Sequence, residues 1–372
     1  MKIVAIEITR HRIPLDPPVP VSWDSRPRES FTINLVRVLT DQGLEGVAAG
    51  DSMGGFAEHA DLFLGLDPRD IERHHAVLDN LCFHYGRWWP LDLALWDLRG
   101  KIEDEPVYRL LGGRDDRVRA YASTALRRDE AESRETAQVL VAQGFGAIKL
   151  RFSTDDWRRD IARAAAVRDA VGPGIDLMVD CNQAWRMSWD TAPSWDLATA
   201  RTVAHALAEL DVYWMEEPLH RGDYAGMTAL RAETGVRIAG GEVTRETHEF
   251  HTLIERGCLD VLQPDCVFVG GITGCARIAA AAREAGLMFT PHTWGNGLGL
   301  LANAHLTVGV GGAPYLELPF DPPHWVPAQR DFGLKETIEP DDDGWLTLPD
   351  RPGLGAALDE DVLRDTLIDG AG

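Results

Sequence analysis

Short apolar runs alternate with Ala-rich helical stretches along the chain from residue 116 onward. Eight runs can be distinguished, at 118–124, 146–152, 176–182, 212–218, 236–242, 261–265, 287–292 and 315–319. Segments 160–171 and 198–210 are typical of the intervening stretches, because their apolar residues recur at helical spacing. Repeated strand–helix units of about 25–35 residues predict a parallel barrel. Between the last two runs we expect only a short, Gly-rich helix.

An open, doubly wound sheet is the alternative architecture for such a repeat. A dinucleotide-binding sheet of that kind carries a GxGxxG turn after a strand, and none of the eight runs is followed by that motif. The preferred fold class is therefore an α/β barrel.

The pattern differs before residue 116. Segments 2–13 and 31–46 are rich in β-forming residues and predict strands, and segment 91–101 is the clearest of the helices expected over 58–111. Two loops separate these elements: a Pro-rich loop at 14–27 and a Gly-rich loop at 50–56. We therefore predict an α+β domain at 1–115, the barrel at 116–324, and a C-terminal tail at 325–372 that folds back onto the first domain.

Ionisable or amide side chains stand where seven consecutive predicted strands end. In chain order they are Lys149, Arg151, Asp180, Asn182, Glu216, Glu242, Asp265, His292 and Glu317. The carboxyl ends of parallel strands meet at one rim of a barrel, so we expect these side chains to lie together. A single residue of this kind more often caps a helix or joins an ion pair, but that reading does not explain seven strands in succession.

The spacing of three of these carboxylates predicts a metal site. Asp180, Glu216 and Glu242 are 36 and 26 residues apart, close to one strand–helix unit each. Oxygen-only ligands favour a hard divalent cation, and Mg²⁺ over zinc or copper.

Composition narrows the choice of partner and compartment. The net charge of −22 excludes a generic nucleic-acid binder and argues against an anionic membrane surface. No stretch approaches the ~18 apolar residues of a membrane span, and the N-terminus does not resemble a signal peptide. The five cysteines form no CxxC pair, which predicts reduced thiols in a cytoplasmic protein.

Several motifs together resemble the mandelate racemase branch of the enolase superfamily. They are ALWDLRGK, AIKLRF, VDCNQAW, WMEEP, AGGE, LQPD…VGG, PHTWG and WLTLPDRPGLG, and they preserve order and spacing over essentially the whole chain. The resemblance implies a modified, TIM-like (β/α)7β barrel with an α+β N-terminal capping domain completed by the C-terminal tail. It also implies Mg²⁺ on Asp180, Glu216 and Glu242, a preference for Glu216 over Glu217, and a homo-oligomer.

The chemistry of such a site can be argued from the residues. Removing the proton next to a carboxylate leaves an ene-diolate, whose charge a divalent cation and the ammonium of Lys149 would stabilise; enolase-type sites of this kind are a worked example of pKa tuning. His292 is the best candidate base, and Asp265 can hydrogen-bond its other ring nitrogen. Glu317 is expected to contact the substrate carboxylate.

The resemblance places substrate contacts on loops of the capping domain that close over the site. The candidates are Trp23 and Asp24 in the Pro-rich loop, Ser52 in the Gly-rich loop, and Asn182 and Trp294 on the barrel.

One departure from the family pattern directs the choice of reaction. The branch has Lys-x-Lys on the second strand, and in this chain Arg151 takes the place of the second lysine. An arginine side chain has a pKa above ~12 and is therefore a poor base. A two-base racemase is therefore disfavoured. The lysine that the muconate-lactonising branch carries on strand six is also missing, and Phe268 lies in that region.

One effective base fits a dehydratase. The predicted substrate is a small-molecule carboxylate, an acid sugar (aldonate or aldarate), which loses water to give a 2-keto-3-deoxy acid. A racemase or epimerase, a sugar-lactone cycloisomerase, and a non-catalytic barrel with a structural metal site remain as alternatives.

Overall fold

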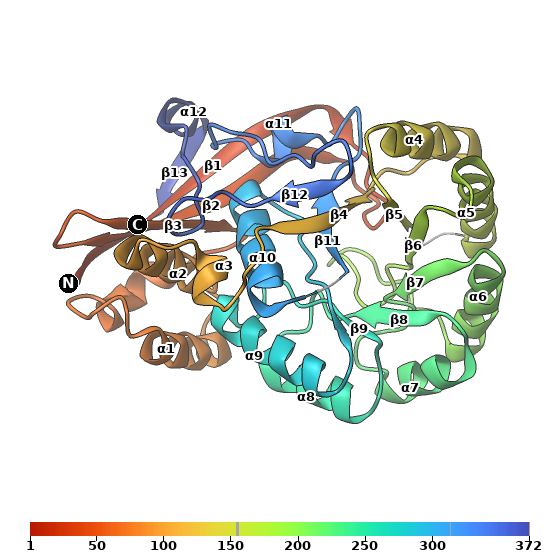
Figure 1. Ribbon diagram of the computed structural model, residues 1–372, viewed down its shortest axis with the longest axis horizontal. Coiled ribbons are helices and arrows are strands. Elements are labelled where there is room, and N and C mark those ends of the chain that lie inside the picture. The colour runs from red at the N-terminus through yellow and green to blue at the C-terminus, as the bar shows by residue number, and fades with distance from the viewer. Residues whose placement is uncertain (154–155, 313, 372) are drawn as a thin grey trace.

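Two sheets organise the chain, one antiparallel and one parallel (Figure 1). The computed structural model describes residues 1–153, 156–312 and 314–371. The antiparallel sheet has the order β13-β1-β2-β3. Its strands are β1 (Ile3–Val19), β2 (Arg28–Thr40), β3 (Glu45–Gly50) and β13 (Leu367–Ala371).

The parallel sheet contains the eight predicted strands. They are β4 (Arg117–Ser123), β5 (Ala147–Arg151), β6 (Asp176–Asp180), β7 (Val212–Glu216), β8 (Arg237–Gly240), β9 (Val261–Leu262), β10 (Met288–Phe289) and β11 (Tyr315–Pro319). Their order is β10-β9-β8-β7-β6-β5-β4-β11, so the first strand pairs with the last. The predicted α/β fold class is confirmed.

Seven helices connect these strands, one in each interval. They are α4 (Glu130–Ala142), α5 (Trp157–Val171), α6 (Leu197–Glu209), α7 (Tyr224–Glu233), α8 (Thr247–Glu255), α9 (Gly271–Glu284) and α10 (Gly297–Val310). Figure 1 shows α4 to α9 around the outside of the strands. Each helix returns the chain to the start of the sheet, so that successive strands run parallel. The strand ends that bear the candidate residues therefore lie at one rim of the barrel.

The expectation of a short helix between the last two strands is wrong. Helix α10 has 14 residues and is capped by the preceding Asn296, whose side chain accepts a hydrogen bond from the backbone N–H of Gly299 at 2.9 Å. It is buried along nearly its whole length, so its sequence has no polar face and no helical periodicity.

The prediction of a loop over 14–27 is also partly wrong. Strand β1 continues to Val19, which pairs with Arg28 of β2. The ladder is irregular between Pro14 and Val19, and this irregularity accommodates prolines that have no N–H to donate. The remaining loop, 20–27, connects the two long strands β1 and β2.

The antiparallel sheet packs on α2 (Pro90–Glu103). The other elements of this region are the 3-10 helix η1 (Phe56–Leu62), α1 (Ile71–His84), which packs on α2, and α3 (Val107–Leu110), which packs on α2 and α10. The fully buried Asp97 of α2 accepts hydrogen bonds from the backbone N–H groups of Val47 and Leu354, both at 2.7 Å, and pairs with Lys101 at 2.8 Å. One carboxylate therefore joins β3, α2 and the C-terminal tail.

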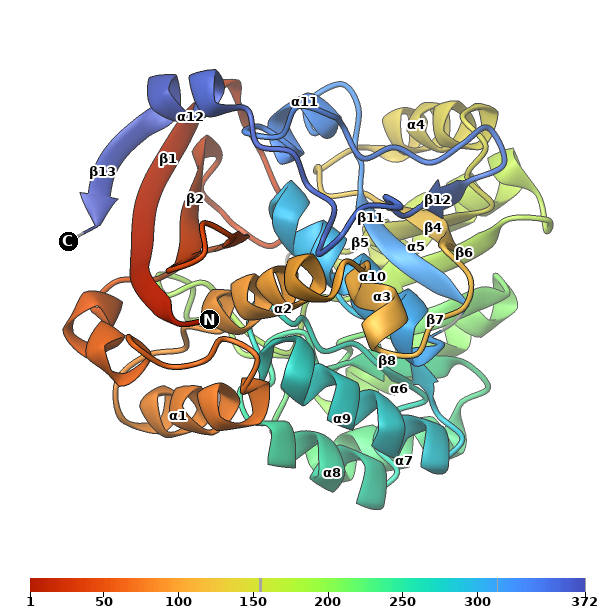
Figure 2. The same ribbon diagram turned by 60° about the vertical axis from the view of Figure 1, so that its left-hand side comes forward.

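The tail contacts both sheets (Figure 2). It contains α11 (Pro327–Arg330), β12 (Trp345–Thr347) and α12 (Glu360–Thr366) before β13. Strand β12 pairs antiparallel with β4 of the barrel, and β13 pairs antiparallel with β1 of the N-terminal sheet. The exact domain boundaries stay predictions. Within the described ranges, the helices are all too short or too polar to cross a membrane.

Candidate active site

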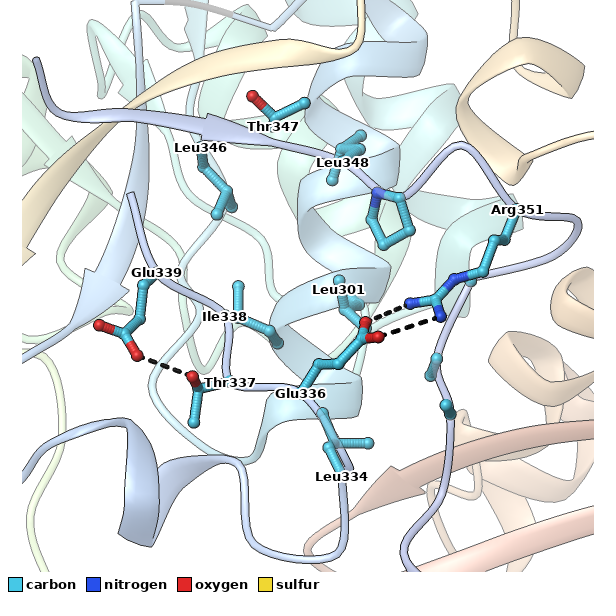
Figure 3. A pocket seen from close by; sticks show the side chains of 14 residues that line it. Leu301, Leu334, Glu336, Thr337, Ile338, Glu339, Leu346, Thr347, Leu348 and Arg351 are labelled. Atoms are coloured by element: carbon cyan, nitrogen blue, oxygen red, sulfur yellow. Dashed lines mark hydrogen bonds and ion pairs between the residues drawn. The ribbon is translucent and has the colours of Figure 1, made fainter. Parts of the chain in front are cut away.

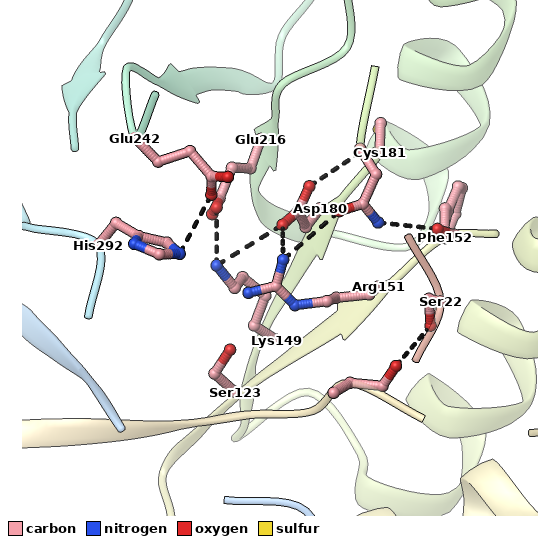
Figure 4. A network of polar contacts seen from close by, with 12 residues as sticks. Ser22, Ser123, Lys149, Arg151, Phe152, Asp180, Cys181, Glu216, Glu242 and His292 are labelled. Carbon is pink, nitrogen blue, oxygen red and sulfur yellow. Dashed lines mark hydrogen bonds and ion pairs between the residues drawn. The ribbon is translucent and has the colours of Figure 1, made fainter. Parts of the chain in front are cut away.

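The three predicted metal ligands converge at the carboxyl ends of their strands (Figure 4). Asp180 ends β6, Glu216 ends β7, and Glu242 follows β8. One oxygen of each lies within 4.8 Å of the others, and all three side chains are buried. The neighbouring Glu217 lies instead with Leu219 and Met227 beside another small cavity.

Fixed donors orient these carboxylates. Asp180 accepts from the backbone N–H of Asn182 at 2.9 Å, Glu216 from the side chain of Gln263 at 2.9 Å, and Glu242 from the indole of Trp185 at 2.8 Å. The second oxygen of Glu242 is buried and makes no hydrogen bond among the described residues; it faces the ring Nε2 of His292 at 3.3 Å. Such an oxygen is costly to bury unless a ligand satisfies it.

The donor set fits a hard divalent cation. Burial raises the pKa of Asp180 and of Glu216 because the charged forms lose their hydration; Lys149 and Arg151 oppose this shift, and repulsion from neighbouring carboxylates adds to it. A cation relieves both effects at once. Carboxylate oxygens alone, without thiolate or imidazole ligands, are the set that Mg²⁺ prefers.

Lys149 lies between two carboxylates on the floor of the site. Its ammonium is 2.7 Å from Glu216 and 2.8 Å from Glu317, and the side chain is fully buried. Burial lowers the pKa of this ammonium, but the two carboxylates raise it more, so the net shift is upward. Lys149 is therefore a fixed positive charge beside the metal ligands.

Arg151 is held on three sides. Its guanidinium donates to Asp180 at 2.6 Å and to the backbone oxygen of Thr124 at 3.1 Å. It also lies against the rings of Trp23 and Trp294, at 4.7 and 5.2 Å from their centroids. Burial lowers its pKa, but Asp180 and the other carboxylates outweigh burial, so the pKa of Arg151 is above its ordinary value.

His292 faces the site between two carboxylates on opposite sides of the imidazole ring. Its Nδ1 is 3.0 Å from Asp265, and its Nε2 is 3.3 Å from Glu242. Burial lowers the pKa of His292, but Glu242, Glu317 and Asp265 raise it to about 9. Asp265 is itself fixed by Asn303, which donates to its other oxygen at 2.8 Å.

Glu317 of β11 completes the cluster. It accepts from the hydroxyl of Ser123 at 2.6 Å and from the backbone N–H of Thr293 at 2.9 Å. Burial raises its pKa, but Lys149, His292 and Arg151 together lower it well below the usual range. Glu317 is therefore an ionised acceptor that holds Lys149 and Arg151 in place.

A cavity of about 440 Å³ opens over this rim. Arg151, Glu242 and His292 line it, together with the predicted substrate contacts Trp23 and Trp294. The other three predicted contacts have different surroundings. The amide of Asn182 contacts Arg151 at 3.4 Å and the backbone of Phe152 at 2.9 Å. The Asp24 carboxylate is buried against Arg28 at 3.1 Å, and Ser52 is exposed beside the lining residue Asp51.

Sequence reasoning missed two charged residues that line this cavity, Arg28 and Asp51. Both belong to the N-terminal domain, at the start of β2 and just after β3. No local motif distinguishes them from other surface charges. Only the packing of the N-terminal sheet over the barrel rim brings them to the site.

A second cavity, of about 400 Å³, lies under the C-terminal tail (Figure 3). Its floor is apolar, with Leu301 of α10 and the tail residues Leu334 and Ile338, and Glu336 pairs with Arg351 at 2.6 Å at its edge. It contains none of the candidate residues at the strand ends, so the cavity over the barrel rim is the candidate active site.

Two family models match this chain. The model for the mandelate racemase / muconate lactonizing enzyme N-terminal domain matches residues 3–112, and the enolase C-terminal domain-like model matches residues 132–362. The chain therefore belongs to the mandelate racemase / muconate lactonizing enzyme branch of the enolase superfamily.

Several relatives of this chain are named as sugar-acid enzymes. The chain is 31% identical to arabinonate dehydratase of Saccharolobus solfataricus over 279 residues, covering 74% of this chain and 70% of that protein. It is 29% identical to D-galactarolactone cycloisomerase of Agrobacterium fabrum, with 98% of each covered. The structure of L-talarate dehydratase from Polaromonas sp. JS666 with Mg and L-glucarate superposes with a TM-score of 0.83 at 30% identity, covering 99% of this chain and 98% of that one.

Proposed function

We propose that this protein is a Mg²⁺-dependent acid-sugar dehydratase. In this reaction the hydrogen next to the substrate carboxylate is removed, water is eliminated from the neighbouring carbon, and a 2-keto-3-deoxy acid results. The observation that carries the proposal is the arrangement at the cavity: His292, held by Asp265, faces the metal ligands, while Arg151 stands where a second base would be needed.

The geometry of Arg151 favours one base over two. A racemase needs a group on each face of the reacting carbon that can accept a proton. Arg151 is bound to Asp180 and lies against two indole rings, and its pKa is raised. A guanidinium in these surroundings stays protonated and serves to bind an anion or stabilise negative charge.

The remaining roles follow from position. A cation on Asp180, Glu216 and Glu242 would supply positive charge where negative charge develops on the substrate oxygens. Lys149 adds a second fixed charge, and Glu317 keeps Lys149 and Arg151 in place. A cation on Glu242 would offset much of the negative charge that raises the pKa of His292, so that the neutral imidazole can take the α-proton. The resulting imidazolium then returns a proton to the departing hydroxyl.

A screen of aldonates and aldarates with Mg²⁺ tests this proposal. We expect formation of a 2-keto acid from at least one acid sugar, measured by NMR of the product. A product that has inverted at the α-carbon without loss of water would contradict dehydration and indicate an epimerase. A product that is an isomeric ring-opened or ring-closed acid would indicate the cycloisomerase reaction named for the Agrobacterium relative.

Replacing Asp265 with Asn should lower kcat by at least about 10-fold while changing KM less, because the imidazole loses the carboxylate that orients it and stabilises its charged form. Steady-state kinetics with the substrate found in the screen measures this. Asp260→Asn is the matched control: Asp260 precedes the same strand and pairs with Arg231 at 2.7 Å, away from the cavity lining. Equal losses of kcat in both variants would contradict a positioning role for Asp265.

A further inference from the structure

The side chain of Asn303 is a fully buried amide on α10, the helix that begins shortly after His292. Its Nδ2 donates to Oδ1 of Asp265 at 2.8 Å and to the backbone oxygen of Gly299 at 3.3 Å. Its Oδ1 accepts a hydrogen bond from the backbone N–H of Cys266 at 3.1 Å. One amide therefore holds both the side chain of Asp265 and the backbone of the residue that follows it.

The orientation of this amide follows from the chemistry of its neighbours. If the amide were turned by 180°, its oxygen would face two acceptors, the Asp265 carboxylate and the Gly299 carbonyl, and its N–H groups would face the N–H of Cys266. Such an arrangement would leave buried polar groups without partners, which is costly. Asn303 therefore presents a donor to Asp265.

The two oxygens of Asp265 have separate partners. Oδ2 lies 3.0 Å from Nδ1 of His292. Oδ1 accepts from Asn303 at 2.8 Å and from the backbone N–H of Val267 at 2.9 Å. Because Oδ1 is held by two donors, the plane of the carboxylate is fixed and Oδ2 stays directed at the imidazole.

Close packing brings α10 to the turn that carries Asp265. This turn follows β9, and the backbone oxygen of Asp265 accepts hydrogen bonds from the N–H groups of Phe268 and Val269, both at 2.9 Å. A Cβ at Gly299 would lie 3.0 Å from a methyl group of Val267, so a glycine at this position lets the helix approach the turn. The amide that holds Asp265 is therefore carried by a buried helix and not by an exposed loop.

We propose that Asn303 is a positioning residue for the reaction, which acts through Asp265 to orient the imidazole of His292 toward the α-hydrogen of the substrate. This inference rests on the proposed function, because it assumes that His292 is the base. Asn303 itself is fully buried and is not part of the cavity lining. Its effect should therefore appear in the rate of proton removal and not in the binding of substrate or metal.

Asn303→Leu tests this proposal, because leucine has a similar size and suits a buried helix but cannot donate to Asp265. We expect kcat for loss of the α-hydrogen to fall by about 10-fold, since a small displacement of a catalytic group is costly. KM and the affinity for Mg²⁺ should stay within about two-fold of wild type, because only the reacting geometry changes. The loss should not exceed that of Asp265→Asn, because Val267 still donates to Oδ1.

Thr307→Val is the matched control. Thr307 is also fully buried on α10, and its hydroxyl donates to the backbone oxygen of Asn303 at 2.7 Å. Valine has the same shape, so this variant also removes a buried hydrogen bond from the helix, but it keeps the contact between Asn303 and Asp265. It should retain wild-type kcat. Thermal unfolding and the number of Mg²⁺ sites found by calorimetry show whether the two variants are folded to the same extent.

A double-mutant cycle separates positioning from a loss of folded protein. If Asn303 acts only through Asp265, Asn303→Leu should change kcat by less than about two-fold in a protein that already carries Asp265→Asn. A purely structural role would lower kcat by the same factor in both backgrounds. Equal factors in the two backgrounds, or a loss of kcat in Thr307→Val as large as that in Asn303→Leu, would overturn the inference.

Following the α-hydrogen by ¹H NMR in D₂O keeps this inference separate from the proposed function. A product that is inverted or isomerised and not dehydrated would overturn the proposed function, while slower loss of the α-hydrogen in Asn303→Leu would still support the positioning role. Keto-acid formation at the wild-type rate in Asn303→Leu would support the proposed function and overturn only this inference.

Discussion

Replacing His292 with Asn should lower kcat for keto-acid formation by at least about 10³-fold. Asparagine has no ionisable nitrogen to take the α-proton, and general acid–base catalysis by one positioned group contributes about 10²–10⁴-fold. Here the same side chain is proposed to act twice, first as base and then as acid. The loss of kcat should therefore lie toward the upper end of that range. Product formation followed by NMR measures it.

The control for this variant is His248→Asn, because His248 is an exposed histidine on α8. It should retain wild-type kcat. If His292→Asn keeps more than a tenth of the wild-type kcat while remaining folded, another group removes the proton and the proposed role of His292 is wrong.

Replacing Glu242 with Gln should lower the affinity for Mg²⁺ by at least about 100-fold. Loss of groups that only support metal ligands costs about 10–100-fold, and a direct ligand should cost at least as much. The substitution is conservative, since the amide oxygen of glutamine can still accept the hydrogen bond that Trp185 donates at 2.8 Å. What disappears is the negative charge and the carboxylate oxygen that lies 3.3 Å from His292 Nε2.

Titration calorimetry with Mg²⁺ on the wild-type protein and on Glu242→Gln measures this change. Glu217→Gln is the matched control, because Glu217 is buried directly after Glu216 in the chain and lines a different cavity with Leu219 and Met227. It is not one of the three carboxylates whose oxygens lie within 4.8 Å of one another. It should bind Mg²⁺ within a few-fold of wild type. If Glu217→Gln loses the metal and Glu242→Gln keeps it, the ligand assignment is wrong.

The barrel was predictable because its strands are short, apolar and evenly spaced. All eight predicted runs overlap a strand of the parallel sheet, and the polar residues at their ends meet because parallel strands share one rim. Asp180, Glu216 and Glu242 could therefore be predicted as a cluster from spacing alone. The choice of Glu216 over Glu217 came from the family resemblance, and strand alternation agrees with it, since Glu216 ends β7 with its side chain toward the rim.

Other features could not be predicted, for identifiable reasons. Helix α10 lacks a polar face because it is buried on all sides, so periodicity gave no signal. Arg28 and Asp51 line the site because the N-terminal sheet packs over the barrel. In the sequence, both residues lie more than a hundred positions before most of the strand-end residues, so no local pattern connects them. The substrate contact of Asp24 stays a prediction; in the structure its carboxylate is buried and contacts Arg28 and Trp189.

The central claim is that a divalent cation on the carboxylate triad and His292 together remove the proton next to a substrate carboxylate. The most direct measurement is ¹H NMR of the acid sugar in D₂O with the wild-type protein and Mg²⁺. We predict that the α-hydrogen is lost only when both Mg²⁺ and His292 are present, so that a chelator or His292→Asn stops its removal. Loss of the α-hydrogen that continues with chelator, or in His292→Asn, would contradict the account.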